Sequence, residues 1–86
     1  MEVKLQNHQG THLFEGDYFI DVPIFLAKLE YAETFEDMKI IVEKHLKYKH
    51  DVTEVFSDGN GETSCVVFQL EHKNEYKVLL TIHKEV

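Results

Sequence analysis

Histidines are the residues of this chain whose chemistry first suggests a site, and there are six: His8, His12, His45, His50, His72 and His83. Imidazole nitrogens are common metal ligands, but these histidines have no recognised ligand spacing. Gly10 lies in a predicted turn between the first two, and His45 and His50 point to different faces of a predicted helix. Because no Cys-x-x-Cys or His-Glu-x-x-His motif is present, we expect surface histidines without a metal or cofactor. A site assembled by folding, for example from His72 and His83, is the alternative.

The single cysteine, Cys65, is a candidate nucleophile. It falls inside a predicted strand, without a nearby base or helix N-terminus to activate the thiol. The adjacent carboxylates of Glu36 and Asp37 are explained by the start of a helix, where negative charge is favourable. The acidic stretch at residues 58–62 lacks the spacing of a calcium-binding loop and predicts a turn. The sequence therefore predicts a protein that is not an enzyme.

Charge is the most unusual bulk property of the chain. Sixteen acids and nine lysines give a net charge of −7, and there is no arginine. Direct binding to nucleic acid is disfavoured, because arginine is the preferred residue for recognising phosphates and bases. Residues 15–37 hold one base, Lys28, and seven acids: Glu15, Asp17, Asp21, Glu30, Glu33, Glu36 and Asp37. This segment is either a solvated surface or an acidic surface for a basic partner.

Length and composition indicate one domain, residues 1–86, with enough apolar residues for a packed core. No apolar run has the length of a membrane span, and the first residues do not resemble a signal peptide. One cysteine excludes an internal disulfide framework. We therefore expect a cytoplasmic protein without a membrane partner.

The C-terminal third, residues 63–84, predicts a β-hairpin around which the fold is organised. Apolar and other residues alternate along both arms, which is typical of strands with one buried face. The alternation places Phe68 and Leu80 in the core and Gln69 outside it. A strand over residues 52–56 adds a third member, and short strands are expected at residues 3–6 and 11–14. The predicted fold class is α+β: an antiparallel sheet, with a C-terminal three-strand meander plus short N-terminal strands, and one or two helices on one face.

Two segments predict helices. Asp21 followed by Pro23 is a helix-start signal, and Thr34 followed by Asp37 resembles a capping box that begins a helix over residues 35–49. A single helix over residues 23–49 would be roughly 40 Å long, which exceeds the size of a compact domain of this length. We therefore expect a break near Thr34. A continuous helix in a homodimer or a domain-swapped form is the alternative.

An apolar patch is expected on the face of the hairpin opposite the core. Its members are Cys65, Val67, Leu79 and Thr81. We expect the N-terminal segment to cover it through Leu13, Phe14, Tyr18 or Phe19. The alternative is that a partner protein or a second copy of the chain covers it.

These observations favour a non-catalytic protein-interaction or regulatory module that presents the seven acids to a basic protein. An inhibitor that imitates the charge of nucleic acid suits this size and balance. The alternative function is a small-ligand or metal-binding domain that uses the histidines. No sequence motif identifies the partner.

Overall fold

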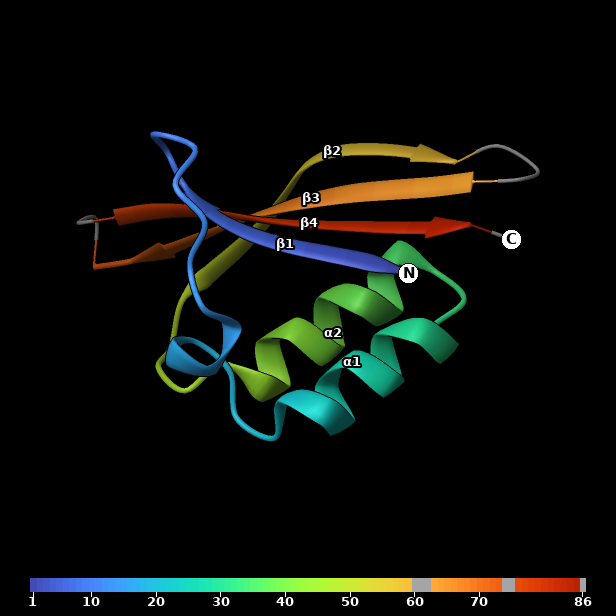
Figure 1. Cartoon of the computed structure of the whole chain (residues 1–86), viewed down its shortest axis with the longest axis horizontal. Helices are drawn as coiled ribbons and strands as arrows, with labels where there is room; N and C mark the ends of the chain where they lie inside the picture. Colours follow the sequence, from blue (N-terminus) through green and yellow to red (C-terminus); the bar gives the residue numbers. More distant parts are fainter. Residues whose placement is uncertain (60–62, 74–75, 86) are drawn as a thin grey trace.

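A four-stranded antiparallel sheet forms one layer of the molecule, and two helices cover one of its faces (Figure 1). This computed structural model describes residues 1–59, 63–73 and 76–85. The strands lie in the order β1-β4-β3-β2. The elements follow one another as β1 (Glu2–Asn7), a short 3-10 helix η1 (Glu15–Asp17), α1 (Val22–Tyr31), α2 (Phe35–His45), β2 (Asp51–Gly59), β3 (Thr63–His72) and β4 (Tyr76–Glu85). The predicted α+β fold with its C-terminal meander is confirmed.

The hairpin of β3 and β4 has the predicted register. Phe68 pairs with Leu80, and both side chains are fully buried under the helices. Gln69 pairs with Leu79 on the opposite face, as the period of two requires. Burial of a large apolar side chain contributes about 1.5–3 kcal/mol, so this alternation fixes which face receives the helices. The predicted hairpin loop at residues 72–75 lies in part outside the described residues.

Strand β2 is longer than predicted and contains a β-bulge. It runs to Gly59, and its pairing with β3 shifts by one residue between Glu54 and Phe56. Val55 is the extra residue, and a bulge of this kind bends the strand and increases its twist. Residues 58 and 59, which were predicted to begin a turn, belong to the strand; the rest of that predicted turn lies outside the described residues.

Helix α2 begins as predicted and ends earlier. The hydroxyl oxygen of Thr34 accepts a hydrogen bond of 3.0 Å from the backbone N–H of Asp37, which satisfies one of the free amides of the first turn. The predicted end at Lys49 is wrong, because the chain becomes extended at Leu46. There Leu46 forms an antiparallel bridge with Phe19, and this pairing takes the place of further helical turns.

Helix α1 is separate from α2 in this structure, so the predicted break near Thr34 is confirmed. The chain leaves α1 at Ala32, which has extended backbone angles. At the other end Asp21 occupies the N-cap position and Pro23 lies in the first turn, as expected. From the sequence, the Asp21 carboxylate was also expected to cap the first amides of this helix. That expectation is wrong, because Asp21 has a left-handed backbone with φ of 51° and its side chain forms no capping bond.

The N-terminal segment differs most from the prediction. Residues 11–14 form no strand and contribute only a bridge between Gln6 and His12. The preceding turn is confirmed: the side-chain oxygen of Asn7 accepts hydrogen bonds from two backbone amides, and Gly10 adopts φ of 83°. Farther along, Phe19 enters the core and stacks on Phe25, with ring centres 4.4 Å apart. This segment therefore packs at the helical side of the sheet.

Candidate functional site

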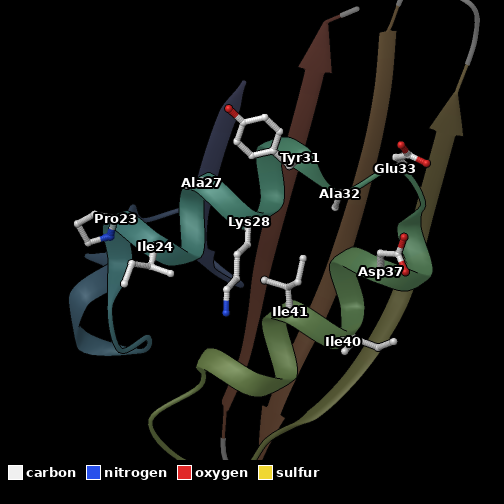
Figure 2. Close-up of a pocket in the computed structure, with 10 residues that line it drawn as sticks. All are labelled: Pro23, Ile24, Ala27, Lys28, Tyr31, Ala32, Glu33, Asp37, Ile40 and Ile41. Carbon is white, nitrogen blue, oxygen red and sulfur yellow. The ribbon is translucent and has the colours of Figure 1, made fainter.

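A groove of about 760 Å³ runs between α1 and α2 on the outer side of the helical layer (Figure 2). Helix α1 buries Phe25 and Leu29 in the core, and a different side of the helix lines the groove. Most of the lining is apolar and comes from both helices and their connection: Pro23, Ile24, Ala27, Tyr31, Ala32, Ile40 and Ile41. Three of these side chains are strongly exposed, with exposed fractions of 84% for Tyr31, 55% for Ile24 and 43% for Ile40.

One end of the groove is acidic. Glu33 in the connection and Asp37 in the first turn of α2 line it, and Figure 2 shows both carboxylates at this end. In the described part of the chain, neither carboxylate forms an ion pair; the ion pair found there joins Lys4 and Glu2. Both groups are exposed. They can therefore interact with a cation brought by another molecule.

The structure divides the seven predicted acids into two groups. Glu30, Glu33, Glu36 and Asp37 lie at or next to the connection between the helices, and Glu33 and Asp37 line the groove. The other three precede α1 at its opposite end: Glu15, Asp17 and Asp21. Since the ten residues of α1 span about 15 Å, the seven acids do not form a single cluster.

Lys28 lies along the groove but is directed toward α2 rather than toward the acids (Figure 2). Its Nζ atom is 3.4 Å from Nε2 of His45. His45 is only 6% exposed, which corrects the expectation of a surface histidine. Its Nδ1 atom lies 2.9 Å from the carbonyl oxygen of Ile20, an acceptor, so Nδ1 carries the proton and Nε2 accepts from Lys28. His45 is a structural residue that joins α2 to the segment before α1.

The predicted apolar patch lies on the face of the sheet away from the helices. Cys65, Val67, Leu79 and Thr81 are each partly buried there. The N-terminal segment does not cover this face, because Leu13, Tyr18 and Phe19 pack against the main core. Phe14, the fourth expected member of the cover, is largely exposed. Phe56 extends the patch. It is half exposed, lies on the edge strand β2 and pairs with Val67 of β3, so its side chain is on the same face.

Cys65 has a histidine neighbour that the sequence did not reveal. His83 is its direct cross-strand partner on β4, which corrects the expectation that no base lies near the thiol. Side chains at such paired positions lie about 4.5–5.5 Å apart at Cβ. No hydrogen bond between them is found in the described ranges, and the two residues lie on an open sheet face. This pair does not form an enclosed catalytic site.

A second cavity, of about 320 Å³, lies at the end of the sheet near η1. His50 and His72 line it together, with ring centres 5.0 Å apart. The remaining lining residues are Leu13, Asp17, Tyr18, Tyr48 and Val78. The alternative pair considered from the sequence, His72 with His83, is excluded, because these residues lie at opposite ends of the hairpin. Among the described residues, no group of three or more His, Cys, Asp or Glu side chains is arranged to hold a metal ion.

The chain matches no protein-family model, no curated protein and no solved structure at a significant level. Within the described ranges, neither helix has the length and apolar character needed to span a membrane.

Proposed function

We propose that this protein is a non-catalytic interaction module whose groove between α1 and α2 binds a basic amphipathic helix of a partner protein. The observation that carries the proposal is the combination of exposed apolar side chains along the groove with exposed carboxylates at its end. Apolar residues of the partner helix enter the groove, and its lysine or arginine residues face Glu33 and Asp37.

The apolar lining supports a protein ligand. Contiguous exposed apolar surface on a small domain commonly marks an interaction site, and Tyr31, Ile24 and Ile40 keep a large part of their side chains in solvent along one groove. A groove between two helices accepts a third helix by the same packing of ridges into grooves that joins the first two. Helix α1 is about 15 Å long, which matches roughly three turns of such a ligand.

The charge distribution supports a basic ligand. Four acids surround the connection between the helices, and the chain as a whole carries −7. Acidic groups at the rim of an interface accelerate association with a basic partner and disfavour acidic ones. Exposed charges are screened over about 8 Å at physiological ionic strength, so the interaction is expected to weaken as salt is added.

A titration monitored by NMR tests the proposal. The probe is a synthetic amphipathic helix of leucine and lysine, and the matched control is a helix of leucine and glutamate. The lysine helix is expected to shift the backbone amide signals of α1 and α2 and to bind more weakly in high salt. The glutamate helix is expected to leave these signals unchanged. Equal binding of the two helices, or shifts confined to the open sheet face around Val67, would contradict the proposal.

Charge reversal locates the site. The double substitution Glu33→Lys and Asp37→Lys is expected to weaken binding of the lysine helix roughly tenfold, because two attractive pairs become repulsive. The matched control is Asp51→Lys with Asp58→Lys, which reverses two exposed acids on the edge strand β2. Glu85, another acid at the end of a strand, would be a poor control, because it lines a cavity together with Glu33 and is therefore close to the proposed site. Equal losses in the two double variants would show that binding depends on net charge and not on the groove.

A further inference from the structure

Two histidines are brought together by the bulge in β2. Beyond the bulge, Ser57 pairs with Val66, and this register, continued without a shift, would place Asp51 opposite His72. The extra residue Val55 moves the register by one, so that Asp51 pairs with Glu71. His50 precedes Asp51 and His72 follows Glu71, so this shifted register places His50 opposite His72. The bulge is thus the feature that makes the two imidazoles neighbours.

Both imidazoles are held in the same way through Nδ1. In His50 this atom lies 2.8 Å from the carbonyl oxygen of Tyr48, and in His72 it lies 2.8 Å from the carbonyl oxygen of Lys49. A carbonyl oxygen only accepts hydrogen bonds, so each neutral ring carries its proton on Nδ1 and has a lone pair on Nε2. In the described part of the chain, neither Nε2 atom has a hydrogen-bond partner. Metal-binding histidines characteristically donate their second ring N–H to a carbonyl or carboxylate in this manner.

The distance between the rings also suits a shared ion. A tetrahedral ion about 2.0–2.1 Å from each of two imidazole nitrogens places the ring centres roughly 5 Å apart. The observed separation of the His50 and His72 ring centres is 5.0 Å. The rings line one cavity with the exposed Asp17, whose negative charge favours a cation there.

We propose that His50 and His72 chelate one divalent transition-metal ion through their Nε2 atoms. The two imidazoles supply two ligands, and water molecules occupy the remaining coordination positions. Catalytic zinc sites likewise keep one position for water. Imidazole selects Zn²⁺, Ni²⁺ and Cu²⁺ over Mg²⁺ and Ca²⁺, which prefer oxygen ligands. This site shares no lining residue with the groove between the helices. A failure to bind Zn²⁺ would therefore not bear on the binding of a basic helix, and the reverse also holds.

Titration calorimetry with Zn²⁺ tests the proposal. All proteins carry Cys65→Ser, so that the thiol beside His83 does not compete for the ion. Substitution by asparagine is informative, because its amide nitrogen can replace Nδ1–H as a donor while Nε2 is lost. His50→Asn and His72→Asn are each expected to weaken binding of Zn²⁺ by at least about tenfold. The control is His83→Asn, at the other end of the sheet, which is expected to bind Zn²⁺ as the parent does; Mg²⁺ is expected not to bind.

Long-range ¹H–¹⁵N spectra of histidine side chains provide a second measurement that does not depend on the folding of a histidine variant. On addition of Zn²⁺ to the parent protein, which carries Cys65→Ser and retains all six histidines, the Nε2 signals of His50 and His72 are expected to shift together, while their Nδ1 atoms remain protonated. Equal weakening by the His83 control, shifts spread over all the histidines, or the absence of saturable binding would overturn the proposal.

Discussion

The ammonium group of Lys84 on β4 lies 2.6 Å from the carbonyl oxygen of Glu30 at the end of α1. The same nitrogen donates to the carbonyls of Leu29 and Ala32 at 3.2 and 2.8 Å. The last carbonyls of a helix lack partners within the helix and carry partial negative charge. One side chain of the sheet therefore completes the hydrogen bonding of a helix more than fifty residues earlier in the chain.

Lys84→Met is expected to lower the free energy of unfolding by about 1.5–3 kcal/mol, because it keeps the aliphatic stem and removes hydrogen bonds from a charged donor. Urea denaturation measures the effect. The matched control is Lys77→Met on the same strand, whose side chain is exposed and should change stability by no more than about 0.5 kcal/mol. Equal effects would mean that the bonds to the end of α1 contribute nothing.

Phe68→Ala is expected to cost about 3–5 kcal/mol, since the ring is fully buried and its removal leaves a cavity. Gln69→Ala, one residue along β3 and on the other face, should have an effect of about 0.5 kcal/mol or less. Thermal or chemical denaturation of the two variants compares the two faces of one strand. A larger loss from Gln69→Ala would contradict the register of the hairpin.

His45→Phe is expected to lower the free energy of unfolding by about 1–3 kcal/mol. The new ring can still pack against Phe25, but the carbonyl oxygen of Ile20 loses its donor. Lys28→Met removes the other bond of His45 and should cost less, because the lysine is exposed. Denaturation of both variants shows which bond of His45 matters; an unchanged stability of His45→Phe would refute the structural role.

The two helix starts should respond differently to substitution. Thr34→Ala is expected to cost about 0.5–2 kcal/mol because it removes the capping bond to Asp37, and Thr34→Ser should restore most of the loss. Asp21→Gly should cost nothing, since Asp21 makes no capping bond and glycine adopts its left-handed backbone without strain. Thermal melting checks both; a larger loss at Asp21 would show that its carboxylate supports the helix.

Local patterns predicted the parts of the fold that depend on local physics. The alternation around Phe68 and Leu80 predicted the hairpin and its buried face, and the spacing of Thr34 and Asp37 predicted the start of α2. The end of α2 was not predictable in this way. It depends on a bridge between Leu46 and Phe19, which are far apart in sequence.

The candidate sites were predicted less well because both depend on tertiary placement. Glu33 and Asp37 were among the expected acids, but the apolar groove beside them arises only when α1 and α2 pack together. The proximity of His50 and His72 depends on the bulge at Val55, and no residue in that stretch signals a bulge. A glycine there would have been such a signal.

The position of β4 between β1 and β3 also constrains how the protein is made. Strand β1 is synthesised before the other strands of the sheet, yet its hydrogen-bonding partner, β4, is the last of them to be synthesised. The meander of β2, β3 and β4 is built from neighbouring segments and can form early, whereas β1 must wait and then join by a contact between distant parts of the chain. Such non-local pairing slows folding. During synthesis, the apolar side chains of β1, Val3 and Leu5, therefore stay exposed to solvent until β4 has been made and can pair with them.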